Sequence, residues 1–230
     1  LQEAFDIIDR NALRSFWLSL KITDPSDWNY GAFSTCAGGE VDTRAIYCIL
    51  ASADMLDMLD DDELTAGLVL WLLRCQGYDG GFSAFPGAET HGGYTFTAAS
   101  SLYILGAGHL CDIDALERWT VTKQMEQEGG FCGRTLKLVD SCYSYWVGAV
   151  LAIVALCRQQ GAVYTRESYK EFLLKQMNKT PEKTQEECSV ITTDDDKNND
   201  SEIDITKESN TSPSNKILTS PNKKISKLTS

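Results

Sequence analysis

The sequence lacks an excess of basic charge. It carries 21 Lys and Arg residues against 33 Asp and Glu residues, a formal net charge of −12. Proteins that bind nucleic acid or an anionic membrane over a broad surface use positive charge to do so. The balance therefore argues against a nucleic-acid partner, and an anionic ligand requires a local cluster of basic side chains.

Paired-cysteine motifs and long hydrophobic runs are also missing. The eight cysteines form no C-x-x-C pair, and several lie in apolar runs, where reduced thiols pack as small hydrophobic groups. The most apolar run, residues 147–157, is about half as long as a membrane span, and residue 1 begins no signal-like segment. We therefore expect a soluble, cytoplasmic protein without stable membrane insertion.

The sequence contains enough apolar residues to form a substantial hydrophobic core, since 43% of its 230 residues are hydrophobic and 10% are aromatic. This composition ends abruptly, because Phe172 is the last aromatic residue and polar or charged side chains dominate from Asn178 onward. A segment of that kind cannot offset its ordering entropy. We expect a folded domain over residues 1–177 and a polar low-complexity tail or insertion, disordered, over residues 178–230.

A glycine-rich turn recurs along the chain. Phe33, Phe82 and Phe131 each follow Gly-Ala or Gly-Gly and lie 49 residues apart. Helix-compatible segments precede the turns, over residues 8–21, 64–76 and 115–127. Apolar segments poor in charge follow them, over residues 41–58, 93–105 and 141–157. Each unit is therefore predicted to be a helix, a glycine-rich turn and a second helix.

The two helices of each unit differ in polarity. The first alternates apolar and charged residues at helical spacing, as an outward-facing helix does, whereas the second is apolar almost all round and needs cover on every side. This pattern predicts an all-α fold with two concentric layers of helical hairpins. A fourth turn would fall near residue 180, where the sequence becomes polar. We therefore expect about three repeats with apolar faces open at both ends.

The repeat also locates a candidate site, because residues at equal distances from the phenylalanine occupy equivalent places. Nine residues after it stand Asp42, His91 and Asp140. Eleven residues after it stand Arg44, Gly93 and Cys142, and after fourteen and fifteen come Tyr47 with Cys48, Phe96 with Thr97, and Tyr145 with Trp146. All lie where an inner helix begins, and helix N-termini favour anions. We predict that the inner-helix N-termini converge on one site.

Taken singly, these residues have simpler interpretations. Asp140 and Cys142 carry groups that bind zinc, but residues two apart diverge by about 200° on a regular helix, so they share an ion only where the first turn is irregular. A helix cap for Asp140 and a buried thiol for Cys142 suit the pair alone. Arg134 and Lys137 suit a solvated turn, and His91 suits a cap. The aromatic candidates are individually most simply core residues: Tyr47, Tyr94, Tyr143 and Trp146.

Four segments stand out by their order and spacing: GGEVDTRAIYC from Gly38, CQGYDGGF from Cys75, HGGYTF from His91 and GRTLKLVDSCYSYW from Gly133. Together they resemble the β subunits of protein prenyltransferases. The similarity runs from about residue 8 to about residue 160. GGEVDTR and HGGYTF look like the farnesyl enzyme, while DSCYSYWVGA is also similar to the type I geranylgeranyl enzyme.

The resemblance implies an α–α barrel, or toroid, that pairs with a helical-repeat α subunit as a heterodimer. It implies a zinc-dependent prenyltransferase, farnesyltransferase-type, that moves a farnesyl group from farnesyl diphosphate to the cysteine of a C-terminal C-a-a-X protein substrate. In the family the Asp and Cys of the D-x-C motif bind zinc, here Asp140 and Cys142. The zinc holds the substrate thiol as a thiolate nucleophile.

The resemblance also assigns the remaining site residues. The diphosphate, whose charge grows as the C–O bond breaks, is expected to be held by His91, Arg134, Lys137 and Tyr143. The isoprenoid slot is expected to be lined by Arg44, Tyr47, Tyr94, Thr97 and Trp146. At Thr97 the farnesyl enzymes usually carry Cys, a difference that bears on fit rather than chemistry. Asp140, Cys142, Lys137 and Tyr143 form the expected catalytic set.

One departure from the family concerns the third zinc ligand, a histidine on a later inner helix. This chain has only His91, assigned to the diphosphate, and His109, in a turn region. We therefore expect an incomplete barrel, with a truncated non-catalytic module that binds an α-type subunit or an isoprenoid as the alternative. A terpene cyclase is disfavoured because the acidic runs at residues 60–63 and 194–196 lie in an outer-helix leader and in the tail.

Overall fold

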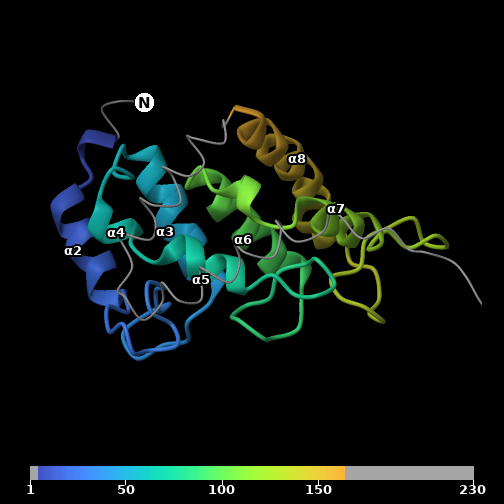
Figure 1. Cartoon of the computed structure of the whole chain (residues 1–230), viewed down its shortest axis with the longest axis horizontal. Coiled ribbons are helices and arrows are strands. Elements are labelled where there is room, and N and C mark those ends of the chain that lie inside the picture. Colours follow the sequence, from blue (N-terminus) through green and yellow to red (C-terminus); the bar gives the residue numbers. More distant parts are fainter. Residues whose placement is uncertain (1–4, 164–230) are drawn as a thin grey trace, which may run out of the picture. The chain divides into compact units, whose positions relative to one another are not determined.

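The computed structural model describes residues 5–163, which are helical apart from turns and isolated bridges (Figure 1). The elements are α2 (Arg10–Leu20), α3 (Thr43–Met55), α4 (Asp62–Thr65), α5 (Leu68–Arg74), α6 (Gly92–Ile104), the 3₁₀ turn η1 (Gly108–Leu110), α7 (Ile113–Val121) and α8 (Ser141–Val163). The predicted tail over residues 178–230 lies outside the described residues. Within them the all-α prediction is confirmed.

The helices that the sequence predicts to be inner ones pack against one another. Helix α6 contacts α3 on one side and α8 on the other. Its apolar residues are buried almost all round, including Phe96, Ala98, Ala99 and Leu102. The outer helices lie against this layer, α5 on α6 and α7 on α8 (Figure 1). The two-layer arrangement predicted from helix polarity is therefore present.

The three glycine-rich turns are built in the same way. In each, the last residue before the turn forms an isolated bridge with the repeated phenylalanine: Lys21 with Phe33, Gln76 with Phe82, and Gln124 with Phe131. A second bridge closes each turn, pairing Ser34 with Val41, Ser83 with Thr90, and Cys132 with Val139. These small hairpins deliver the chain to the start of each inner helix at the same position.

Helix α8 is longer than predicted, because nothing ends it at the point where α3 and α6 end. Asp57 (φ 54°) and Gly106 (φ 71°) are left-handed residues placed 24 residues after their phenylalanines. The equivalent position in the third unit is Ala155, and α8 continues to Val163. Among the described residues, one helical stretch, Ser141–Ala162, is long and apolar enough to cross a membrane. The predicted apolar run of residues 147–157 is thus part of a longer apolar helix than expected; this helix packs against α6 and α7, and 28% of its apolar window is buried.

Candidate functional site

The three inner helices begin with residues that do the same structural work. Asp42, His91 and Asp140 are the residues before α3, α6 and α8. Each side chain accepts a hydrogen bond from the backbone N–H two residues further on, at 2.8, 3.0 and 2.9 Å. This capping satisfies an otherwise unpaired donor of the first helical turn. The positions are therefore equivalent, as the repeat predicts.

His91 and Tyr143 join the N-termini of α6 and α8. The Tyr143 hydroxyl lies 3.0 Å from His91 Nε2, and the two rings are 5.6 Å apart in an edge-on arrangement. Because His91 Nδ1 accepts the backbone N–H of Gly93, a neutral ring carries its proton on Nε2 and donates it to the hydroxyl. Burial, assisted by the nearby charge of Arg134, lowers the pKa of His91 and favours this neutral form.

The Tyr143 hydroxyl keeps its own proton available for a ligand. Burial raises the pKa of Tyr143, so the phenol stays protonated at neutral pH. The ring is held in place by Gly133, where a Cβ atom would lie 2.4 Å from the hydroxyl oxygen. The carbonyl of Gly133 also accepts the backbone N–H of Gly92 at 2.8 Å, which ties the third turn to the start of α6. Tyr143 is thus a fixed donor that accepts from His91.

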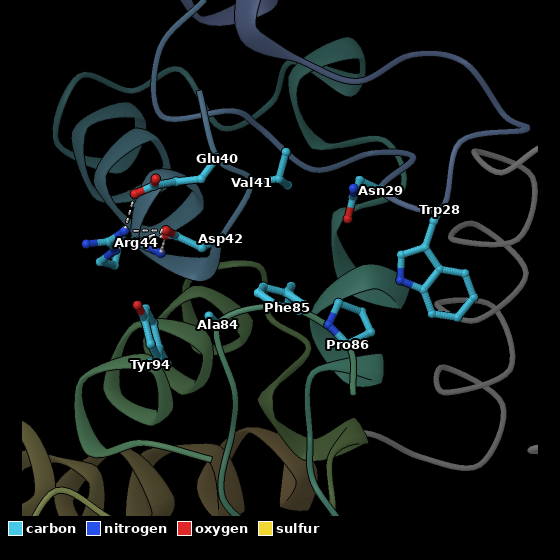
Figure 2. A pocket seen from close by; sticks show the side chains of 10 residues that line it. All are labelled: Trp28, Asn29, Glu40, Val41, Asp42, Arg44, Ala84, Phe85, Pro86 and Tyr94. Carbon is cyan, nitrogen blue, oxygen red and sulfur yellow. Dashed lines mark hydrogen bonds and ion pairs between the residues drawn. The ribbon is translucent and has the colours of Figure 1, made fainter. Parts of the chain in front are cut away.

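Arg44 is held rigidly at the start of α3. Its guanidinium donates to both carboxylate oxygens of Asp42 and to Glu40, and it lies 5.6 Å from the centre of the Tyr94 ring (Figure 2). Hydrogen bonding to Asp42 raises the pKa of Arg44 further above its already high value. Tyr94 in turn lies 5.2 Å from His91, ring to ring. Arg44, Tyr94, His91 and Tyr143 therefore form one continuous run of contacts.

A second run consists of aromatic rings placed fourteen residues after each phenylalanine. The Tyr47 and Phe96 rings are 5.3 Å apart, and the Phe96 and Tyr145 rings are 5.4 Å apart. Trp146 adds a contact of 5.3 Å to Phe96. Such offset ring pairs stabilise beyond simple area burial. The repeat spacing placed Phe96 and Tyr145 at positions equivalent to Tyr47, but the family resemblance assigned only Tyr47 and Trp146 to the isoprenoid slot.

Thr97 lies at the contact between α6 and α3. Its side chain is only 6% exposed, and its hydroxyl shares a hydrogen bond of 2.8 Å with the hydroxyl of Thr43. It also donates to the carbonyl of Tyr94 at 3.1 Å. Thr97 therefore joins α6 to α3 in the helix interface, and its predicted place in an isoprenoid slot depends on its methyl group alone.

The two predicted basic residues behave differently. Arg134 forms an ion pair of 2.9 Å with Glu89, which links the third turn to the residues just before His91. Lys137 is exposed in the same turn, and its backbone N–H donates to the carbonyl of Arg134 at 3.4 Å. The turn between them is left-handed at Leu136, whose side chain is 99% exposed. Arg134 therefore lies near the His91 run, whereas Lys137 extends into solvent.

Asp140 and Cys142 lie closer together than helical geometry suggests. Asp140 is the cap and not a helical residue, so its side chain folds back over the first turn of α8. Local desolvation and the hydrogen bond to the Asp140 carboxylate raise the pKa of Cys142, while hydrogen bonding to Cys142 lowers the pKa of Asp140. The cap interpretation of Asp140 is confirmed, but Cys142 is exposed and is not a buried thiol. The carboxylate and the thiol are thus within hydrogen-bonding reach of each other.

This pair does not complete a zinc site by itself. A protein zinc site needs three or four ligands, and residues 5–163 contain no group of three His, Cys, Asp or Glu side chains that could hold a metal ion. His109 lies in η1, in the turn region where the sequence places it. A third ligand would have to come from outside the described residues.

A cavity of about 660 Å³ adjoins Arg44 and Tyr94 (Figure 2). It lies between the first two turns, where Trp28 and Phe85 expose 60% and 50% of their surfaces. Its volume is within the range of sites that take drug-sized ligands. Arg44 thus contacts the Tyr94 ring and also lines this cavity.

Comparisons with known proteins agree with this architecture. Residues 1–185 match the model of the prenyltransferase alpha-alpha toroid domain. The chain is 40% identical over 153 residues to the protein farnesyltransferase subunit beta of Schizosaccharomyces pombe, an alignment that covers 66% of this chain and 38% of that protein. It is 39% identical over 130 residues to the geranylgeranyl transferase type-1 subunit beta of Arabidopsis thaliana, covering 51% and 34%.

A solved structure shows the same fold. The Candida albicans protein geranylgeranyltransferase-I complexed with GGPP superposes with a TM-score of 0.54 at 24% identity, over 67% of this chain and 49% of that one. The chain therefore spans about two fifths or less of the length of these curated relatives, and about half of the solved chain.

Proposed function

The chain belongs to the prenyltransferase alpha-alpha toroid family. From that premise we propose that it is part of the β subunit of a zinc-dependent protein farnesyltransferase. The substrate is farnesyl diphosphate, and the acceptor is the cysteine of a C-a-a-X protein. The enzyme works as a cytoplasmic heterodimer with an α subunit. The farnesyltransferase assignment is supported by several curated β subunits of that name at about 40% identity.

The observation that carries the proposal is the run of contacts from Arg44 through Tyr94 and His91 to Tyr143. It connects residues from three inner helices whose positions in the sequence are 49 residues apart. Helix formation requires only a capping acceptor at the start of each inner helix. The side chains found there nevertheless include a guanidinium, an imidazole and two phenols. An oriented set of donors beside an aromatic wall suits a ligand with an anionic head and an apolar tail.

The diphosphate is proposed to lie against the hydroxyl of Tyr143. His91 donates to that hydroxyl, which leaves the phenolic proton to point at a ligand oxygen. Hydrogen bonds to a charged acceptor are stronger than neutral ones, and polarisation along the His91–Tyr143 pair strengthens this donor. Arg134, whose ion pair with Glu89 is partly exposed, supplies positive charge from the adjacent turn.

The isoprenoid is proposed to run along the ring series Tyr47, Phe96, Tyr145 and Trp146. Zinc is proposed to bind Asp140 and Cys142 together with a ligand outside residues 5–163, and when bound it supplies a thiolate at the acceptor cysteine. Lys137, exposed in its turn, is free to swing toward charge that develops on the leaving group.

The experiment is a transfer assay with the 230-residue chain, an α subunit, farnesyl diphosphate and a C-a-a-X peptide, run beside an isoprenoid-diphosphate binding assay. Transfer supports the enzyme proposal for this chain. Binding without transfer supports the alternative of a non-catalytic module. Preference for geranylgeranyl diphosphate would point to the type I enzyme, and the absence of binding would overturn both proposals.

A further inference from the structure

The three glycine-rich turns can be compared position by position, because the same two bridges close each of them. Five residues after the phenylalanine stand Gly38, Gly87 and Leu136, and all three are left-handed, with φ 70°, 83° and 59°. Glycine adopts this backbone without strain, whereas the Cβ of any other residue crowds the following carbonyl oxygen. The third turn therefore places a leucine where the first two turns have the residue that suits the backbone.

The strain at Leu136 is not offset by contacts of its side chain, which is 99% exposed. At Gly38 and Gly87, a Cβ would meet no atom within 4 Å among the described residues beyond its chain neighbours, so a side chain at this position projects from the turn. A bulky residue at positive φ is an outlier that persists only where its surroundings compensate for the strain. For Leu136 that compensation lies outside residues 5–163.

A second position of the third turn differs in the same way. Seven residues after the phenylalanine, the first two turns carry Glu40 and Glu89, and each forms an ion pair with an arginine, at 2.8 and 2.9 Å. The third turn has Leu138 there, and it is 87% exposed. Single exposed apolar side chains are common on soluble proteins. Two in one turn, both in place of residues that suit a solvated turn, indicate a surface that another molecule covers.

The third turn also differs in charge. Over the eight residues after the phenylalanine, the first two turns each carry one glutamate and no basic residue. The third turn carries Arg134 and Lys137 and no acidic residue, in a chain whose net charge is −12. Lys137 stands between the two leucines and is exposed. Complementary charge steers association and selects the partner, so this turn suits a protein surface that is both apolar and acidic.

We propose that Leu136, Lys137 and Leu138, here called the leucine tip, dock an apolar and acidic surface of the α subunit. This inference rests on the proposed function, which pairs the chain with such a subunit and assigns Lys137 to the leaving group. A subunit that covers both leucines also covers the lysine between them. Exclusion of water strengthens the contact of that lysine with a negative charge. The heterodimer contact and the leaving-group lysine thus share one turn.

Binding of the 230-residue chain to the α subunit, measured by isothermal titration calorimetry, tests the proposal. The double variant Leu136→Gly/Leu138→Glu gives the third turn the residues that the first two turns carry at these positions. It should bind the α subunit at least about tenfold more weakly, because two apolar anchors of the interface are lost. It should melt no lower than the unmodified chain, because glycine relieves the left-handed strain.

Met55→Glu is the matched control. Met55 is also a large apolar residue, 64% exposed, but it lies at the last position of α3, away from the turns. This variant should bind the α subunit within about twofold of the unmodified chain. A residue that only stabilised the fold would lower the melting temperature together with the affinity, so the two readouts separate docking from a structural role.

The proposal is overturned if the unmodified chain does not bind the α subunit, if the double variant binds it equally well, or if that variant melts lower. A dimer of the chain alone that the double variant loses would make a second copy the occupant. Binding to phosphatidylcholine vesicles that the double variant loses would make a lipid surface the occupant. Docking that depends on the leucines, without binding of farnesyl diphosphate, would support this inference and contradict the proposed function.

Discussion

His91 Nε2 and Tyr143 Oη lie 3.0 Å apart, although the two residues are 52 positions apart in the chain. The contact crosses from the start of α6 to the start of α8, and it leaves the phenolic proton unused by His91. Because His91 is also a helix cap, its ring cannot turn without releasing the backbone N–H of Gly93. The orientation of the Tyr143 hydroxyl is therefore fixed by His91, whose own ring is fixed by its hydrogen bond to the backbone of Gly93.

Replacement of Tyr143 by Phe should weaken binding of farnesyl diphosphate about 10- to 150-fold, because it removes one hydrogen bond to a charged group, worth about 1.5–3 kcal/mol. Isothermal titration calorimetry measures the affinity. Tyr78→Phe, at a fully exposed tyrosine, is the control and should bind as the unmodified chain does. Equal affinity of the two variants would remove Tyr143 from the diphosphate site.

The stability of the fold should fall as the pH drops below about 6.5. Burial lowers the pKa of His91 in the folded state, so the unfolded chain takes up a proton first and is favoured at lower pH. His91→Asn keeps a capping acceptor and should flatten the decline between pH 6.5 and pH 5. His109, whose pKa burial also lowers, should keep part of the slope. Urea denaturation across this range measures both, and an unchanged slope in His91→Asn would contradict the assignment.

Lys21 should give the fold a pH dependence of the same sign in a higher pH range. Burial lowers its pKa to about 7, whereas an unfolded lysine keeps its proton to about pH 10. Between pH 7 and pH 8.5 the unfolded state therefore holds more protons, and the stability contributed by this site rises with pH. Lys21→Gln, which copies Gln76 and Gln124, should abolish that rise, while Lys137→Gln at an exposed site should keep it. Denaturation midpoints of the three chains at both pH values decide the matter.

Gly133 should not tolerate a side chain. A Cβ there would lie 2.0 Å from the Tyr143 ring, so Gly133→Ala should destabilise the fold by about 2 kcal/mol or more and move the ring. Gly148→Ala is the control in α8, because no atom of residues 5–163 outside its own helix backbone lies within 4 Å of a Cβ placed there. That change should instead stabilise by about 0.5–1 kcal/mol through helix propensity. Thermal unfolding of both variants reports the signs.

Cys142→Ala and Lys137→Ala should separate metal binding from leaving-group stabilisation. In a chain that contains the third ligand, Cys142→Ala should lose zinc and turnover yet bind farnesyl diphosphate within about twofold of normal. Lys137→Ala should retain zinc and lower kcat by about tenfold or more, because its contact forms as charge develops. Metal analysis and single-turnover kinetics give the two readouts. Equal loss of diphosphate binding in both variants would refute this division of roles.

The 49-residue period made much of this structure predictable. Because Phe33 and Phe82 are fully buried at matching places, the positions nine and fourteen residues later could be compared directly, and both align in space. Side-chain direction was not predictable from spacing. Thr97 faces α3 because its hydroxyl finds Thr43, and Asp140 reaches Cys142 because it precedes the helix. The predicted end of α8 was also wrong. The equivalent helices α3 and α6 end before a left-handed residue, whereas Ala155 at the matching position is helical and α8 continues to Val163.

The shared cap has a consequence for how such a site can diversify. Asp42, His91 and Asp140 satisfy the same backbone demand with different acceptor groups. The fold requires at these positions only a side-chain acceptor that reaches the backbone N–H two residues further on. Exchange of a carboxylate for an imidazole therefore alters reactivity while the helix remains capped. Each copy of the repeated hairpin therefore provides one cap position at which the side chain, and with it the chemistry of the site, can change independently of the other copies.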